Sequence, residues 1–252
     1  MKNQAHEFAI FSQELNNLNL KNNSSKFDSN SIIVFKDKNL YHRLISILRF
    51  EVGHELIIFD QINNFKVKIL SLNKNGEIKF EVLSKNKNKV LTPELIWVLP
   101  ILKKQALEDA VYSLAEIGAN QIQLVITEKS QKNFDDKLLS RLNSIVISGA
   151  EQSKNFSFPE ILAPIKLAEL NLSKFINKIY FDPDGDNIAK LITELNSEKN
   201  SNIIAMCGPE GDLTEQEKEF IKTLGFNFYA LTPTVLRSSQ AVAIGSGILR
   251  SI

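Results

Sequence analysis

The sequence has little cysteine or histidine and no long apolar run, and each shortage excludes a class of protein. The only cysteine, Cys207, has no partner for an internal disulfide, which fits a reducing compartment such as the cytoplasm. The histidines His6, His42 and His54 lack the spacing of zinc ligands, so we expect no metal site. No run of about 18 apolar residues occurs, and residues 1–7 contain no apolar signal segment. We therefore expect a cytoplasmic protein that does not enter a membrane.

Strong charge of one sign is also missing, since the net charge is only +1. The charge is unevenly distributed, however. Residues 1–90 hold 14 Lys and Arg against 9 Asp and Glu, whereas the remainder holds 16 against 20. A basic N-terminal region followed by an acidic C-terminal region is expected when one domain binds a polyanion and another carries out the catalysis. Compositional drift toward Lys and Asn gives the same pattern, so charge alone leaves both interpretations open.

The hydrophobic pattern changes near residue 85 and predicts two domains. Three short β-type runs come first, at 55–60, 65–72 and 77–83, with an Asn-Gly hairpin signal before the last. Short strands with close turns suggest a small β-barrel. Beyond a polar, charged stretch, strands alternate with helices, which is typical of a parallel α/β sheet. We predict a β-barrel over 1–84, a solvated linker over 85–92 and an α/β domain over 93–252.

The remaining elements follow from periodicity and from start and stop signals. A strand at 31–35 and a short amphipathic helix at 41–49 are predicted in the first domain. In the second, strands are predicted at 95–99, 122–126, 161–165, 176–181, 203–207 and 228–231. Helices are predicted there at 104–117, 136–151, 188–195 and 236–249.

The most informative stretch is 206–247, which contains two strand-to-helix turns. The buried strand 203–207 ends in the loop Gly208-Pro209-Glu210-Gly211, and Thr214 with Glu217 forms a capping box that starts a helix. Glycines in such a loop let main chain approach a flat ligand, because no Cβ intervenes. Two neighbouring turns at the carboxyl edge of a parallel sheet form a ligand crevice. Neither Gly-x-Gly-x-x-Gly nor a P-loop is present, which disfavours a generic nucleotide-binding enzyme.

Short motifs along almost the whole chain resemble one family. Gly208-Pro209-Glu210-Gly211 followed by Val235-Leu236-Arg237 is similar to the cofactor-binding half of the SPOUT methyltransferases, and more narrowly to the RsmE family. Other motifs fall in the family's order: 43–49, Gly53, 59–60, Lys104, 116–118, 127–128, 151–153, 159–161 and Glu217. The resemblance implies a PUA-like barrel followed by a SPOUT domain with a C-terminal trefoil knot. It also implies a homodimer that uses S-adenosylmethionine to methylate N3 of a uridine in small-subunit (16S) ribosomal RNA.

Adenine of that cofactor would be held by main-chain groups of the crevice, between apolar side chains of Met206, Leu231 and Leu236. Core packing is the alternative for at least one of these three. Cys207 is expected to be a small buried hydrophobic residue rather than a nucleophile. The candidate cofactor-binding residues are Asp182, Pro183, Met206, Cys207, Gly208, Gly211, Leu231, Pro233, Val235 and Leu236.

Arg237 and Glu210 are the candidate catalytic residues. Arg237 begins a helix, where the helix dipole disfavours a cation. Its functional interpretation is that it binds a phosphate or a uracil oxyanion, and the alternative is an ordinary surface arginine. Glu210 can accept a proton or cap a loop. For RNA binding we select His42, Arg43, Arg49 and Lys104, a solvated helix face being the alternative for the first three.

Several polar positions depart from the family pattern: Ser113, Lys129, Asn155, Asp212, Thr232, Ser239 and Gln240. The apolar and glycine scaffold matches better, which favours cofactor binding. Two alternatives therefore stay open. One is an RNA-binding or ribosome-assembly factor that has lost catalysis, and the other is a SPOUT enzyme acting on another RNA.

Overall fold

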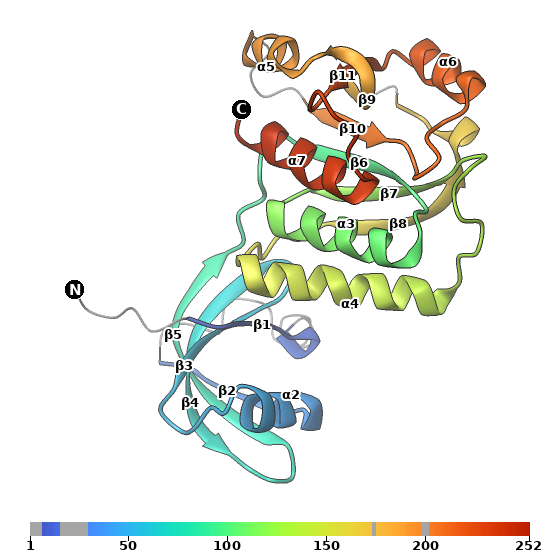
Figure 1. The fold of residues 1–252 in the computed structure, drawn as a ribbon. Helices are drawn as coiled ribbons and strands as arrows, with labels where there is room; N and C mark the ends of the chain where they lie inside the picture. Colours follow the sequence, from blue (N-terminus) through green and yellow to red (C-terminus); the bar gives the residue numbers. More distant parts are fainter. Residues whose placement is uncertain (1–6, 16–29, 173–174, 198–201) are drawn as a thin grey trace. The chain divides into compact units, whose positions relative to one another are not determined.

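The computed structural model describes residues 7–15, 30–172, 175–197 and 202–252 (Figure 1). Its contacts divide the chain into two compact units, 1–89 and 90–252, called here the first unit and the second unit. Within the described ranges no helix is long and apolar enough to cross a membrane.

The first unit is built on a five-stranded mixed sheet. Its elements are β1 Ala9–Phe11, β2 Ile32–Lys36, α2 Lys38–His42, the π-helical turn η1 Arg43–Ile47, β3 Glu55–Phe59, β4 Asn63–Leu72 and β5 Glu77–Lys87. The strand order is β1-β3-β4-β5-β2, with β1 and β3 parallel and the other pairs antiparallel. Alternate residues of the long strands point into one apolar core, as period-two patterning requires. Among the described residues β1 and β2 do not pair, so the sheet is open rather than a closed barrel.

The predicted linker begins too early, because β5 continues through Lys87. Residues 85–87 pair with Asn63–Phe65 of β4. The pairing is extended by Asn88, whose amide nitrogen donates to the main-chain oxygen of Asp60 at 2.7 Å. Main-chain ladder bonds do not require apolar side chains, so a polar, lysine-rich sequence concealed the end of this strand.

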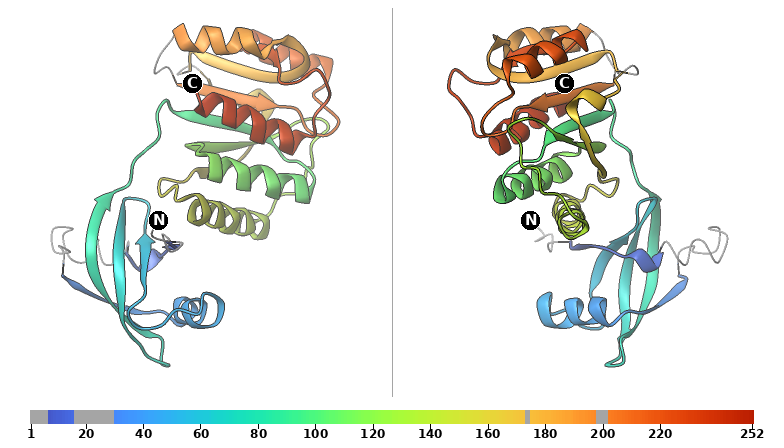
Figure 2. Two further views of the ribbon diagram at one scale, coloured as in Figure 1. Left: turned by 60° about the vertical axis from the view of Figure 1, so that its left-hand side comes forward. Right: turned by 90° about the vertical axis from the view of Figure 1, so that its right-hand side faces the viewer.

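The second unit has a six-stranded parallel sheet covered by helices on both faces (Figures 1 and 2). Its strands are β6 Leu95–Pro100, β7 Gln121–Ile126, β8 Glu160–Lys166, β9 Asn177–Asn187, β10 Ile203–Cys207 and β11 Asn227–Ala230. Its helices are α3 Lys104–Ile117, α4 Asp136–Ser153, α5 Ile188–Ser197, α6 Glu215–Thr223 and α7 Ser238–Arg250, with a 3-10 turn, η2, at Leu167–Glu169. The strand order is β11-β9-β10-β6-β7-β8.

Two separate cores explain why the strands are apolar on both sides. Trp97 of β6 packs in the core that α3, α4, α5 and α7 cover, whereas its neighbour Val98 packs in the core beneath α6 and η2. Both side chains are fully buried. Parallel strands covered on both faces read as continuous apolar runs. The α/β class, which was predicted from the alternation of strands with helices, is confirmed.

Strand β9 runs six residues beyond its predicted end at Phe181. Residues 181–185 form a bulge inside the strand, because β11 pairs on both sides of them: Phe228 with Tyr180, then Tyr229 with Asp186. Helix α7 also starts later than predicted, at Ser238. For β9 the tertiary partner decides the boundary and local composition does not.

The partly buried guanidinium of Arg250 anchors the C-terminal helix α7 to the rest of the second unit. Arg250 donates to the main-chain oxygen of Gly118 from Nε at 2.9 Å and from Nη2 at 2.6 Å, to the main-chain oxygen of Pro93, and to the Asn120 side chain. Burial lowers the pKa of Arg250. One side chain thus ties the last helix to the start of β6 and to the α3–β7 turn.

Replacing Arg250 by alanine should reduce the free energy of unfolding by about 2 to 4 kcal/mol, since several charge-assisted hydrogen bonds are lost and buried carbonyls are left unpaired. Fluorescence of the single tryptophan, Trp97, measures this in urea, because its ring is buried in the second unit. Arg141→Ala is the matched control. It breaks only an exposed ion pair with Glu108 and should cost less than about 1 kcal/mol. Equal losses in the two variants would contradict the anchoring role.

Candidate active site

The carboxyl ends of β9 and β10 bring two of the selected segments to one place. These strands are parallel and in register, with Cys207 opposite Phe181. Asp182, at the bulge inside β9, and Gly208, which directly follows β10, therefore lie at the same level on adjacent strands. The segment 231–237, which joins β11 to α7, follows the strand on the other side of β9. This is the strand-end arrangement that forms ligand sites in parallel α/β sheets.

Side-chain hydrogen bonds join the loop 208–212 to the loops that follow β6 and β7. Glu210 Oε1 accepts from the main-chain N–H of Lys103 at 2.9 Å. Lys129 Nζ donates to the main-chain oxygen of Gly211, also at 2.9 Å. Both contacts connect residues more than 80 positions apart in the chain. The three loops therefore act as one assembly at the edge of the sheet.

Glu210 has a structural task in this assembly. Lys103 is the N-cap residue of α3 and has no side-chain capping bond of its own. By accepting the Lys103 N–H, the exposed Glu210 carboxylate supplies an outside partner at the positive end of that helix. This is the capping alternative that the sequence left open.

Helix α6 begins with the predicted capping box. Thr214 Oγ1 accepts from Glu217 N, and Glu217 Oε2 accepts from Thr214 N at 3.0 Å. The other oxygen of Glu217 accepts from the main-chain N–H of Glu128 at 2.8 Å. The Glu217 carboxylate therefore both starts the helix and anchors the loop after β7.

A charged network centred on Lys218 lies under the loop 208–212. Lys218 Nζ is 2.7 Å from carboxylate oxygens of both Asp182 and Asp212, and the Tyr180 hydroxyl donates to Asp212 Oδ1 at 2.7 Å. Burial opposes the charge of Lys218, but the hydrogen bonds and charges of the two carboxylates raise its pKa above the usual range. Asp212 is one of the positions that depart from the resembled pattern, and its φ of +57° lies in the left-handed region that glycine favours. Its partners offset that conformation.

Asp212 should make the stability of the second unit depend on pH in the acid range. Burial alone would raise the pKa of Asp212, but hydrogen bonds from Lys218 and Tyr180 hold it below its ordinary value of 3.8. A depressed pKa gives stability that is present above the unfolded value and is lost as the pH falls through the folded value. Asp212→Asn should therefore lose stability against wild type near neutrality, and the difference should shrink on acidification below about pH 4.

Urea unfolding at several pH values, followed by Trp97 fluorescence, measures this dependence. Asp136→Asn, a change at an exposed position in the first turn of α4, is the control. A wild-type minus Asp212→Asn difference that stays constant across the acid range would contradict the assignment.

Gly208 is required by its neighbours inside the protein. A Cβ built there would lie 2.4 Å from Asp212 Oδ1 and 2.9 Å from the Tyr180 hydroxyl. At Gly211 a Cβ would meet the Lys129 side chain at 3.2 Å. Glycine at these positions therefore lets the loop close over the charged network, in addition to leaving its main chain bare.

Comparison with known proteins places the chain in a family. Residues 89–250 match the model of a family described as RNA methyltransferase domain. A relative from Mesomycoplasma hyopneumoniae named ribosomal RNA small subunit methyltransferase E is 32% identical over 187 residues, which cover 71% of this chain and 78% of the relative. This chain belongs to the ribosomal RNA small subunit methyltransferase E family.

Other members of the family agree over more of the chain. The Borreliella burgdorferi protein named ribosomal RNA small subunit methyltransferase E 1 is 27% identical over 243 residues, covering 82% of this chain and 96% of the relative. A crystal structure of ribosomal RNA small subunit methyltransferase E from Neisseria gonorrhoeae superposes with a TM-score of 0.80 over 98% of both chains, at 19% identity. The structural likeness shows that the fold is shared.

The selected cofactor-binding residues separate into buried and exposed groups in this family member. Met206 and Cys207 belong to the two opposite cores, so only their main chain is available. Burial raises the pKa of the Cys207 thiol to about 12, in keeping with a hydrophobic role. Asp182 is 6% exposed and committed to Lys218. Leu231 and Leu236 are half-buried, and the exposed members are Pro183, Gly211, Pro233 and Val235, the last with 79% of its surface accessible.

The remaining selected residues fall on both units. Arg237 is exposed at the N-cap of α7. His42, Arg43 and Arg49 lie on or just after α2 and η1 of the first unit, with His42 and Arg49 exposed. Lys104 is the exposed first residue of α3 in the second unit.

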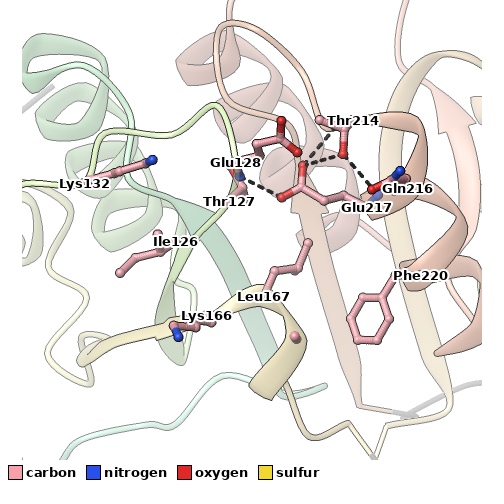
Figure 3. A pocket seen from close by; sticks show the side chains of 11 residues that line it. Ile126, Thr127, Glu128, Lys132, Lys166, Leu167, Thr214, Gln216, Glu217 and Phe220 are labelled. Carbon is pink, nitrogen blue, oxygen red and sulfur yellow. Dashed lines mark hydrogen bonds between the residues drawn. The ribbon is translucent and has the colours of Figure 1, made fainter.

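Sequence reasoning missed a pocket between α6 and the ends of β7 and β8 (Figure 3). None of its lining residues was selected as a site residue, although Thr127, Glu128 and Glu217 were noticed as motif positions. Three segments far apart in sequence form the pocket, so no single motif could indicate it. Within the parts of the chain that the structure describes, no three His, Cys, Asp or Glu side chains gather as metal ligands do.

Proposed function

We propose that this protein transfers the methyl group of S-adenosylmethionine to N3 of a uridine in 16S ribosomal RNA. The observation that carries the proposal is the family match over residues 89–250, supported by relatives named as small-subunit ribosomal RNA methyltransferases. The Neisseria gonorrhoeae structure of the same fold is described as bound to S-adenosyl methionine.

The loops at the ends of these strands suit a nucleoside cofactor chemically. Gly211 is exposed, so a ligand can contact bare main chain there. Among the described residues, the N–H groups of Gly211 and Leu236 have no hydrogen-bond partner, which leaves two donors for polar atoms of a ligand. The exposed apolar side chains of Pro233 and Val235 offer a surface for a flat ring. We assign the cofactor to the segments 182–183, 206–211 and 231–236.

In this assignment the protein mainly aligns the reactants and stabilises charge. S-adenosylmethionine supplies an electrophilic methyl group on a sulfonium centre. Arg237, whose guanidinium has no partner among the described residues, would hold the target nucleotide and stabilise the anion left when uracil N3 loses its proton. Glu210 is the candidate acceptor of that proton, through the carboxylate oxygen that does not bind Lys103.

The other expectations from the family resemblance complete the proposal. The first unit, as a PUA-like module with an open sheet, would bind RNA through His42, Arg43 and Arg49. Lys104 is a separate candidate RNA contact in the second unit. The second would be a SPOUT domain whose C-terminal segment forms a trefoil knot. The protein would act as a cytoplasmic homodimer.

The function is tested by methyl transfer from labelled S-adenosylmethionine to small-subunit particles that lack the modification. Mass spectrometry then identifies the methylated nucleoside. We expect 3-methyluridine. A different methylated nucleoside would indicate a SPOUT enzyme for another target. RNA binding with no transfer would indicate an assembly factor that kept the fold.

A further inference from the structure

The pocket beside α6 has the size and lining of a binding site. Its volume is about 420 Å³, within the range of sites for small organic groups. Ile126, Leu167 and Phe220 form apolar walls, while Lys132 and Lys166 extend at its edge (Figure 3). These residues come from the β7 and β8 ends, the segments that follow them, and α6. Such a lining suits a flat, mostly apolar group with polar edges.

The charges around the pocket favour a neutral ring over a free anion. Lys132 and Lys166 are balanced by Glu128 and Glu217, which also line it. The Glu217 carboxylate is held by main-chain N–H groups of Thr214 and Glu128, so its position is fixed. Lys132 and Lys166 form no ion pair with any residue that the structure describes. The two lysines therefore remain available to phosphates that pass the pocket's edge.

One lining residue lacks a polar partner. Thr127 is 3% exposed, and its Oγ1 has no hydrogen-bond partner in the described structure. Buried hydroxyls are nearly always paired, so this group calls for a partner. Its Oγ1 has almost no accessible surface, so it lies behind the pocket wall and offers no direct contact to an occupant of the pocket.

We propose that this pocket holds the base of one unpaired nucleotide of the RNA substrate, stacked on Phe220, with adjacent phosphates facing Lys132 and Lys166. The inference rests on the proposed function, which makes RNA the occupant. The pocket is joined to the candidate crevice, because Glu217 binds Glu128 N and the next residue, Lys129, binds the Gly211 carbonyl. The bound nucleotide would therefore neighbour the target uridine.

Binding of a fluorescent single-stranded oligouridine to the full chain, measured by anisotropy at several salt concentrations, tests the proposal. Phe220→Leu should weaken binding about tenfold through lost stacking, and Phe220→Tyr should restore it. The double variant Lys132→Ala with Lys166→Ala should lower the steepness of the salt dependence by about 1.4, for two single-strand phosphate contacts. Lys137→Ala with Lys190→Ala, exposed lysines that do not line the pocket, should bind as wild type. Affinity for S-adenosylmethionine should be unchanged in all variants.

The outcomes separate this inference from the proposed function. If the wild type methylates small-subunit particles while the Phe220 and paired lysine variants bind oligouridine like wild type, the pocket assignment is wrong and the function stands. A pocket variant that loses RNA and S-adenosylmethionine affinity together would show a structural role and overturn the assignment. A wild type that neither binds oligouridine nor methylates particles would overturn both.

Discussion

Gly208→Val is expected to weaken S-adenosylmethionine binding at least about a hundredfold, which corresponds to about 2.7 kcal/mol. The first added carbon would already lie 2.4 Å from Asp212 Oδ1 and 2.9 Å from the Tyr180 hydroxyl, and valine adds two methyl groups beyond it. The loop must move, and overpacking of this kind costs about 1 to 3 kcal/mol before any ligand contact is lost. Titration calorimetry with S-adenosylmethionine measures the effect.

Gly247→Val is the matched control for this loop. Gly247 is exposed in α7, and a Cβ built there meets no atom within 4 Å. Its cofactor affinity should equal that of wild type. Thermal unfolding followed by Trp97 fluorescence will show whether the Gly208 variant is folded at the temperature of the titration. A folded Gly208→Val protein with wild-type affinity would place the cofactor elsewhere.

Arg237→Ala should lower the rate of methyl transfer by about a hundredfold to a thousandfold, the loss typical when one donor to a developing oxyanion is removed. Cofactor affinity should change little, because the side chain is assigned to the target nucleotide. Arg237 is exposed, and its side chain makes no capping bond to α7, so its removal should not disturb the fold. Single-turnover methylation of small-subunit particles gives the rate.

Two further arginine variants sharpen that result. Arg237→Lys keeps the charge without the planar fork and should recover only part of the rate. Arg141→Ala removes an exposed guanidinium on α4 that pairs with Glu108 and should methylate at the wild-type rate. Wild-type turnover by Arg237→Ala would remove this residue from the mechanism.

Short sequence signals predicted the helix and strand boundaries that depend only on neighbouring residues in the chain. Helix α3 spans Lys104–Ile117 as expected, because Gly118 takes the left-handed conformation that ends a helix. Strand β10 spans 203–207 because a buried run ends at a glycine turn. The capping box at Thr214 places the start of α6. These features need no knowledge of the rest of the fold.

Features that depend on distant partners could not be predicted. The continuation of β9 requires β11 on both sides of the bulge, and the length of β5 requires Asn63–Phe65 opposite it. Which of the two cores holds the Met206 side chain follows from the face of β10 that it occupies. A run of residues buried on both faces does not reveal which residue points to which face. The tie between Glu210 and Lys103 links residues 107 positions apart. The assignments of Arg237 and of the cofactor segments stay predictions.

The buried position of Cys207 gives the protein a built-in reporter. Its thiol is the only one in the chain, lies buried inside the second unit and resists ionisation at neutral pH. A maleimide or disulfide reagent should therefore leave the native protein unmodified and label it only when β10 is exposed. Labelling rates with and without ligand would then report how often the sheet opens next to the loop 208–212, with no engineered probe.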